Sequence, residues 1–194
     1  MTSELAALLK DLELFGDAND ISNNDRSQKM LNITRDTGEF LLVLVNAMNA
    51  KNILEIGTSN GYSTLWLTQG ASKTNGQVKT IEYSEYKISL ARENFLKSGL
   101  QKYIQQIHGD AAQILDTYIE NETDFIFLDS NRSDYINWWP HIKRSLRTGG
   151  LLVVDNAISH AAELESFIKA VREDDAFITS LLPIGKGEFL ASKV

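Results

Sequence analysis

From Ile53 onward, apolar residues fall in short runs typical of buried strands, and amphipathic segments with helical spacing separate these runs. Strands separated by helices form a mostly parallel sheet with helices on both faces. Only the short turn PIGKG joins the last two runs, so we expect them to pair antiparallel. The pattern predicts an α/β protein with strand order 3-2-1-4-5-7-6 and strand 7 antiparallel. The predicted strands are 53–56, 77–82, 103–109, 124–130, 149–156, 177–184 and 187–193.

Between these strands the expected helices cover 61–70, 83–99, 110–120, a stretch ending near Arg147, and 160–173. The segment DTGEFLLVLVNAMNA, 36–50, has the spacing of a core helix. With two prolines and no linker or repeat, 1–194 is expected to be a single domain. We expect 1–50 to form a helical segment covering the pocket and 51–194 to form the core.

Composition narrows the classes of partner. The chain has 26 acidic and 19 basic residues, a formal charge of −7 and no Lys/Arg stripe, which argues against nucleic acid as a partner. No run of about 18 apolar residues occurs, so we expect no membrane partner and no signal peptide. Cysteine is absent, which excludes thiolate chemistry and fits a cytoplasmic protein.

The stretch ILEIGTSNGYS, Ile53–Ser63, carries the clearest chemical signal. Gly57 and Gly61 bracket a tight turn between a buried strand and a helix, so backbone amides can approach a polar ligand closely. Ser59 stands where a dinucleotide fingerprint has its middle glycine, and Glu55 precedes the first glycine by two residues. The turn therefore predicts a nucleoside-containing cofactor, and it disfavours a nicotinamide-dependent oxidoreductase.

Acidic residues end nearly every predicted strand, at the sheet edge where ligands of doubly wound folds bind. Glu82 follows Gly57 by 25 positions, close to the spacing at which a carboxylate accepts hydrogen bonds from ribose hydroxyls. A solvated strand-end carboxylate is the plainer alternative for Glu82. Asp110 begins a predicted helix, where it can cap free amides and also contact an adenine ring.

Three oxygen ligands are expected to converge at two neighbouring strand ends. Asp129 closes DFIFLD, and Asp155 with Asn156 closes GLLVVDN, on strands about 4.8 Å apart. Carboxylates and an amide oxygen without histidine or cysteine favour Mg²⁺, with Ca²⁺ or Mn²⁺ as alternatives. The alternative is that Asp155 and Asn156 form a turn while Asp129 simply faces the pocket.

Taken together, ILEIGTSNGYS, TIEY, GDAA, FIFLDSNRSDY and LLVVDN resemble the cation-dependent O-methyltransferases, the family of catechol and caffeoyl-coenzyme A O-methyltransferases. The likeness runs from LNITRDTGEFL to PIGKGEFLASK and implies a Rossmann-like methyltransferase fold, S-adenosylmethionine as cofactor and a small-molecule acceptor. It also implies a possible homodimer. The resemblance assigns cofactor contacts to Ile33, Glu55, Ser63, Glu82, Tyr83, Ala111 and Asp129, and metal contacts to Asp129, Asp155 and Asn156.

One position departs from the family pattern. Many members have a lysine three residues after the first metal aspartate, where this chain has Arg132. An arginine stays protonated and cannot serve as a base, although it can stabilise a phenolate. His160 is a candidate replacement base, because histidine ordinarily titrates near neutrality, and the alternative is a solvated helix-start residue.

The other ring side chains have mainly structural interpretations. His108 and His141 have no positional argument for catalysis. Trp138 and Trp139 are expected to pack in the core or at a subunit interface, with the acceptor site as the alternative.

Two functional hypotheses follow. The first is an enzyme that transfers a methyl group to a hydroxyl of a small catechol-like acceptor with the help of a divalent cation, with Asp129, Arg132 and His160 at the reacting end. The second is a cofactor-binding module, or a methyltransferase with a different acceptor and no metal requirement, and Arg132 motivates it.

Overall fold

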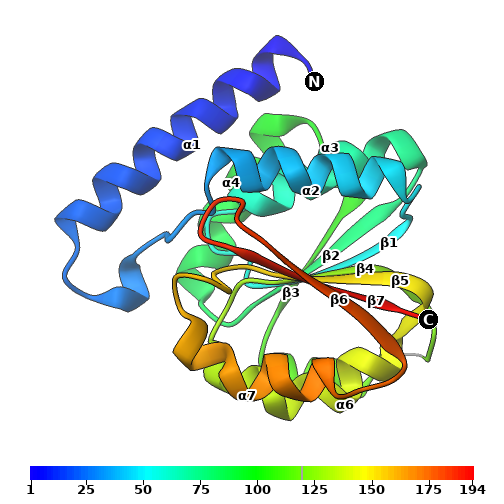
Figure 1. Cartoon of the computed structure of the whole chain (residues 1–194). Helices are drawn as coiled ribbons and strands as arrows, with labels where there is room; N and C mark the ends of the chain where they lie inside the picture. Colours follow the sequence, from blue (N-terminus) through cyan, green and yellow to red (C-terminus); the bar gives the residue numbers. More distant parts are fainter. Residues whose placement is uncertain (119) are drawn as a thin grey trace.

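A computed structural model describes residues 1–118 and 120–194. Its centre is a seven-stranded sheet in the order β3-β2-β1-β4-β5-β7-β6, flanked by helices on both faces (Figure 1). Strand β7 pairs antiparallel with both β5 and β6, and the other neighbours are parallel. The predicted topology is confirmed. The strands are β1 Asn52–Ile56, β2 Gln77–Glu82, β3 Ile104–His108, β4 Thr123–Leu128, β5 Leu146–Val154, β6 Phe177–Leu182 and β7 Glu188–Lys193.

The helices form two layers. One apolar core lies between the sheet and the layer of α1 to α4, and the other lies between the sheet and the layer of α5 to α7. The α-helices are α1 Ser3–Ser22, α2 Arg35–Ala47, α3 Tyr62–Thr74, α4 Glu85–Ser98, α5 Ala111–Asp116, α6 Tyr135–Ser145 and α7 Ala161–Arg172. Short 3-10 turns are η1 Arg26–Gln28, η2 Gln101–Tyr103 and η3 Arg132–Asp134. No helix among these residues combines the length and apolar character needed to cross a bilayer.

Several predicted boundaries were wrong. Helix α3, for example, runs to Thr74 and not to 70, and α2 ends at Ala47 and not at 50. Two further wrong boundaries have a visible cause. Helix α6 ends at Ser145 and β5 begins at Leu146, whereas the sequence predicted a helix to about Arg147 and a strand from 149. The pairing of β4 with β5 is irregular here, because Thr123 pairs with Leu146 and the regular ladder resumes only at Phe125 and Leu151. The strand therefore includes residues 147–150, RTGG. These residues do not alternate between apolar and polar types, so the sequence pattern could not identify them as part of a strand.

The second wrong boundary is the end of α5. This helix stops at Asp116, because the amides of Thr117 and Tyr118 turn back to carbonyls three residues earlier. The prediction for 110–120 includes position 119, which lies outside the described residues.

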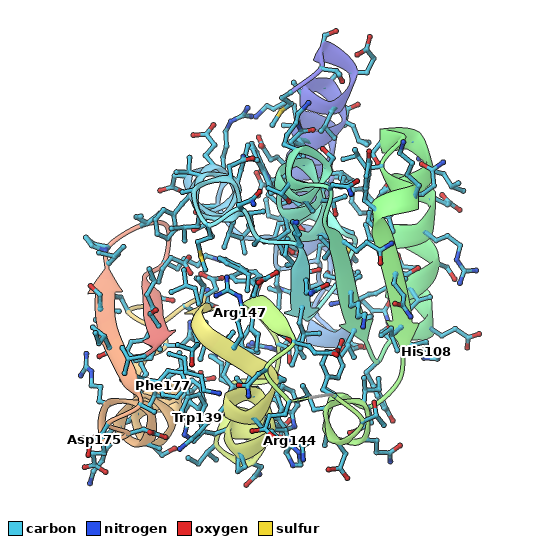
Figure 2. All side chains as sticks on the ribbon, turned by 90° about the vertical axis from the view of Figure 1, so that its right-hand side faces the viewer. His108, Trp139, Arg144, Arg147, Asp175 and Phe177 are labelled. Atoms are coloured by element: carbon cyan, nitrogen blue, oxygen red, sulfur yellow. The ribbon has the colours of Figure 1, made fainter. Side chains whose placement is uncertain are left out.

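The ring side chains on α6 have a structural role. Trp138 and Trp139 are 7% and 8% exposed. The Trp139 ring lies 4.8 Å from that of Phe177 at the start of β6, and both are labelled side by side in Figure 2. Tyr135 stacks on Trp138 with ring centroids 5.6 Å apart. Packing, one of the alternatives considered from the sequence, is confirmed for both tryptophans, and Trp138 also lines the cavity described below.

A fully buried carboxylate joins three elements next to the first turn. Glu55 of β1 accepts hydrogen bonds from Ser63 Oγ at 2.6 Å, from Thr80 Oγ1 of β2 at 2.6 Å, and from Thr64 Oγ1. Burial disfavours the charged form and raises the pKa of Glu55 to about 7, although the three hydroxyl donors oppose the shift. Below neutral pH this carboxyl group is therefore held protonated in the folded protein.

We expect Glu55→Gln to show this linkage. Because the folded-state pKa is raised, the protonated carboxyl contributes stability that is fully present below about pH 4.5 and is lost as pH rises through about 7. The glutamine variant lacks this loss, so its deficit in unfolding free energy should shrink between pH 5 and 8, by about 3 kcal/mol at most. Urea unfolding at several pH values measures the difference. Parallel stability curves for the two proteins would contradict the assignment.

Candidate functional site

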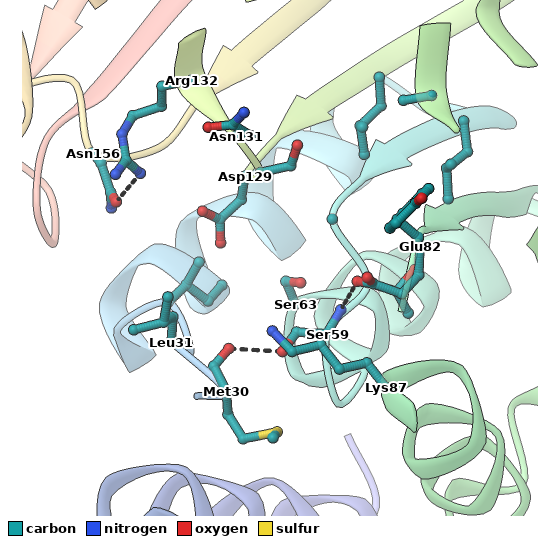
Figure 3. A pocket seen from close by; sticks show the side chains of 18 of the residues that line it. Met30, Leu31, Ser59, Ser63, Glu82, Lys87, Asp129, Asn131, Arg132 and Asn156 are labelled. Atoms are coloured by element: carbon teal, nitrogen blue, oxygen red, sulfur yellow. Dashed lines mark hydrogen bonds between the residues drawn. The ribbon is translucent and has the colours of Figure 1, made fainter. Parts of the chain in front are cut away.

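A cavity of about 670 Å³ opens at the carboxyl ends of the parallel strands. Its wall includes the turn after β1, the end of β2, the residues after β3 and β4, and the segment before α2, shown from close by in Figure 3. Helix N-termini and strand ends face the same space, which is the usual ligand position in this type of sheet. The cavity is lined by the predicted residues Ile33, Gly57, Ser63, Glu82, Tyr83, Asp110, Ala111, Asp129, Arg132, Asn156 and His160.

Two predicted site residues do not line the cavity. Glu55 lies beneath the turn and holds Ser63, which does face the cavity. Asp155 is buried behind Asn156. Either residue can therefore act on a ligand only through its neighbours or after a local rearrangement.

The first turn can adopt its shape only with glycine at Gly57. This residue has φ +110°, and a Cβ atom there would lie 2.0 Å from the carbonyl oxygen of Asp129. Gly61 has φ +87° and precedes α3. The turn after β1 and the end of β4 are thus in backbone contact, which leaves the cavity directly above both.

Glu82 is fixed by backbone amides from two sides. Its carboxylate accepts a hydrogen bond from Ser59 N–H at 2.9 Å (Figure 3). It accepts another from Ser84 N–H at 2.8 Å. Each oxygen retains a free lone pair, since a carboxylate can accept about four bonds. The side chain is thereby oriented to accept further hydrogen bonds from a ligand in the cavity.

The segment before α2 crosses the mouth of the cavity. The carboxylate of Asp20 accepts from the amides of Met30 and Leu31, at 2.6 and 2.9 Å. Ser59 Oγ donates to the Met30 carbonyl at 2.7 Å, which ties this segment to the first turn (Figure 3). Sequence reasoning named only Ile33 here. The left-handed conformation of Leu31, φ +52°, gives no signal in its residue type.

The opposite end of the cavity carries Tyr83, Asp110 and Ala111. Asp110 Oδ1 accepts from the amides of Ala112 and Gln113, at 2.8 and 3.2 Å, so its predicted capping role is confirmed. Tyr83 is 76% exposed, and its carbonyl lies 3.0 Å from His108 Nε2. Tyr83 and Ala111 therefore give this end of the cavity a partly exposed apolar wall.

Carboxylates gather below the other end. Burial, followed by the charges of Asp155 and Glu55, raises the pKa of Asp129 well above its usual range. Glu188, at the start of β7, is fully buried and accepts from Thr37 Oγ1 at 2.9 Å. Burial and the adjacent Asp155 raise the pKa of Glu188 as well. Sequence reasoning missed Glu188, because a glutamate after a turn resembles a solvated residue.

Arg132 holds the third expected metal ligand. It is only 6% exposed, and its NH1 group donates to Asn156 Oδ1 at 3.1 Å (Figure 3). Its Nε group donates to Glu163 Oε2 of α7 at 2.8 Å. Asn156 has φ +67° and donates through Nδ2 to Asp155 Oδ2 at 2.5 Å. The amide of Asn156 is thus oriented from both ends.

Asp129, Asp155 and Asn156 offer the oxygen atoms that a hard cation prefers as ligands. They combine two carboxylates with an amide oxygen at adjacent strand ends, and the mutual repulsion of Asp129 and Asp155 would be relieved by a divalent ion. No cluster of three or more His, Cys, Asp or Glu side chains is placed to bind a metal within 1–118 and 120–194. Any cation would therefore depend on the Asn156 oxygen, which already accepts from Arg132.

The three histidines differ in position. His160 lines the cavity half-buried, and its Nδ1 lies 2.9 Å from Ser159 Oγ, which leaves Nε2 for another partner. His141 lies 3.3 Å from Asp116, and His108 contacts the Tyr83 carbonyl. Neither of them lines the cavity. Only His160 is therefore placed to act on a ligand.

Comparison with known proteins agrees with this geometry. A family model described as O-methyltransferase matches residues 4–194. The chain is 34% identical over 138 residues to the catechol O-methyltransferase of Niastella koreensis, covering 70% of this chain and 62% of that protein. It is 33% identical over 126 residues to the catechol O-methyltransferase of Mycobacterium tuberculosis, covering 65% and 57%. Both alignments span less than two thirds of the relative's length.

A solved structure extends the likeness over almost the whole chain. The O-methyltransferase of Bacillus cereus in complex with SAH superimposes with a TM-score of 0.80 and 25% identity, covering 97% of this chain and 91% of that one. The cavity of the present chain lies at the sheet edge typical of such folds. By its sequence over residues 4–194, the chain belongs to the O-methyltransferase family.

Proposed function

We propose that this protein transfers a methyl group from S-adenosylmethionine to a hydroxyl oxygen of a small, catechol-like acceptor, with the help of a divalent cation. One observation carries the proposal. A single cavity joins an end suited to a nucleoside, with Glu82 and Ala111, to an end with Asp129 and Asn156 at adjacent strand termini. Membership in the O-methyltransferase family supports the reaction type, and the two catechol O-methyltransferases among the relatives support the acceptor class.

The cofactor supplies the reactive methyl group as a sulfonium, and the residues of the chain position it. Glu82, Tyr83 and Ala111 all line the cavity. Glu82 would accept hydrogen bonds from the ribose hydroxyls, while Tyr83 and Ala111 would flank the adenine. Ser63 and the backbone at Ile33 would hold the methionine end, and the Asp129 carboxylate would lie near its amine. The SAH complex of the Bacillus cereus relative supports this choice of cofactor.

The residues proposed to hold the cation are Asp129, Asp155 and Asn156, and Mg²⁺ is the ion best suited to such oxygen ligands. A bound cation would supply Lewis-acid activation of the acceptor hydroxyl. Holding that oxygen in line with the methyl group contributes most of the remaining rate enhancement.

The acceptor proton must leave the hydroxyl as the methyl group arrives. Arg132 cannot take it, because a guanidinium stays protonated, but its charge can stabilise the developing oxyanion. His160 lines the same cavity, its Nδ1 lies beside Ser159 Oγ, and it is the side chain we propose as proton acceptor.

One observation favours the second candidate function, methyl transfer to a different acceptor without a metal. The bond from Arg132 to Asn156 Oδ1 already places a positive charge where the cation would bind. In that case Arg132 itself would face the acceptor oxygen.

The role of Glu82 can be tested by binding. Glu82→Gln keeps the size of the side chain but loses one of the acceptor oxygens shared by Ser59, Ser84 and the expected ribose. Titration calorimetry with adenosylhomocysteine should show affinity reduced about tenfold or more, since bonds to a charged acceptor are lost. Glu85→Gln, on the exposed first turn of α4, is the matched control and should bind normally. Equal affinities for all three proteins would remove Glu82 from the site.

The acceptor and the cation are tested together. Adenosylhomocysteine release from S-adenosylmethionine is measured over a panel of catechols and of phenols that lack vicinal hydroxyls, with Mg²⁺ and with chelator. Turnover should require both Mg²⁺ and two vicinal hydroxyls, and Asp155→Asn should reduce the rate about a hundredfold or more while cofactor binding survives. Undiminished turnover in chelator would refute the metal role, and release only with acceptors lacking vicinal hydroxyls would refute the catechol-like acceptor.

A further inference from the structure

Backbone hydrogen bonds already hold the chain around Asn156 in place, so the fold there does not depend on the contact between Arg132 and Asn156. Residue Asp155 joins the sheet through its own amide, which donates to the Leu128 carbonyl at 3.1 Å. His160 N–H closes the following turn on the Asn156 carbonyl at 2.9 Å. The side-chain oxygen of Asn156 is therefore not needed to hold the backbone here, and Arg132 is its present partner, while Nδ2 of the same amide donates to Asp155.

Arg132 is held so that it cannot easily leave this position. It belongs to η3, which packs against α7, and its Nε group is paired with Glu163 at 2.8 Å. The two side chains interact as a charged pair, because the hydrogen bond from Arg132 lowers the pKa of Glu163. The guanidinium is therefore oriented in advance, with its Nε group bound to Glu163 of α7 and its NH1 group bound to the amide oxygen of Asn156.

A divalent ion on the same oxygen would be close to this charge. Oxygen ligands lie about 2.1 Å from Mg²⁺, and the guanidinium nitrogen lies 3.1 Å from Asn156 Oδ1, so the two cations would be separated by about 5 Å at most. Arg132 is buried, so water screens this repulsion poorly. A guanidinium keeps its charge near neutral pH, so loss of a proton does not relieve the conflict.

We propose that the Arg132 guanidinium and a divalent cation compete for Asn156 Oδ1, so that cation binding requires Arg132 to release the asparagine. This inference rests on the proposed function, since it takes Asn156 as a cation ligand. Arg132 is then a positioning residue of the cation-free protein, and the strength of its bond sets how weakly the protein holds its metal.

The test measures Mn²⁺ binding by electron paramagnetic resonance and calorimetry, without acceptor, because Mn²⁺ takes the same oxygen ligands and is directly visible. Arg132→Met removes the charge and the donors while keeping a long side chain. It should bind Mn²⁺ roughly ten- to a hundredfold more tightly than the natural protein, because no hydrogen bond from a charged group has to be broken.

Arg26→Met is the matched control. Arg26 lines the same cavity but is exposed, and no ion pair of its side chain occurs in the part of the chain that the structure describes. Its removal takes the same formal charge from the cavity without touching Asn156, and should change Mn²⁺ affinity by less than about twofold, since its charge is screened by water. Circular dichroism and thermal unfolding check that each variant is folded.

Arg132→Lys keeps the test decisive if the methionine variant does not fold. A single ammonium group keeps the charge but cannot span Glu163 and Asn156 as a fork, so an affinity between the natural protein and Arg132→Met is expected. Equal Mn²⁺ affinity in the natural protein and in Arg132→Met, or an equal gain in Arg26→Met, would overturn the competition while leaving the proposed function intact. No Mn²⁺ binding by any variant would overturn both the competition and the cation part of the proposed function.

Discussion

The backbone contact between Gly57 and Asp129 is the constraint on which the site depends. With φ +110° and no room for a Cβ atom, Gly57 lets the turn after β1 lie directly against the end of β4. The amide of Asp129 donates to the Ile56 carbonyl at 3.0 Å, and the amide of Gly57 donates to the Ile81 carbonyl at 3.0 Å. Three parallel strands therefore end at one level, and the carboxylates at the ends of β2 and β4, Glu82 and Asp129, face one cavity.

That convergence has an electrostatic cost. Burial, followed by the nearby charge of Asp155, disfavours the ionised forms of both Asp129 and Glu188. Arg132 and Lys186 reduce the cost at Asp129, since their charges oppose its shift. The raised pKa values favour protonated carboxyl groups at the reacting end, and a ligand with a positive centre would favour their ionised forms, with Arg132 as its nearest internal competitor.

Local signals accounted for the fold and much of the cavity wall. Strand and helix periods predicted the order of the sheet, including the antiparallel β7, and Asp110 was predicted as a cap because its residue type and place before a helix suffice. The boundary at Leu146 was missed, since an irregular strand pairing has no pattern of its own. Glu188 and Met30 were missed too, because neither residue type nor spacing marks them as neighbours of the cavity.

The sequence by itself determined which polar residues stand at the carboxyl ends of the strands, because turn chemistry and side-chain alternation are local properties. Only the tertiary structure decided the partners of those residues. Arg132 reaches Asn156 and Glu163, and Thr37 reaches Glu188, across long stretches of chain that only packing brings together. Whether an oxygen faces a ligand or a neighbouring guanidinium is a matter of a few ångströms, and such distances are set by the packing of whole helices on the sheet.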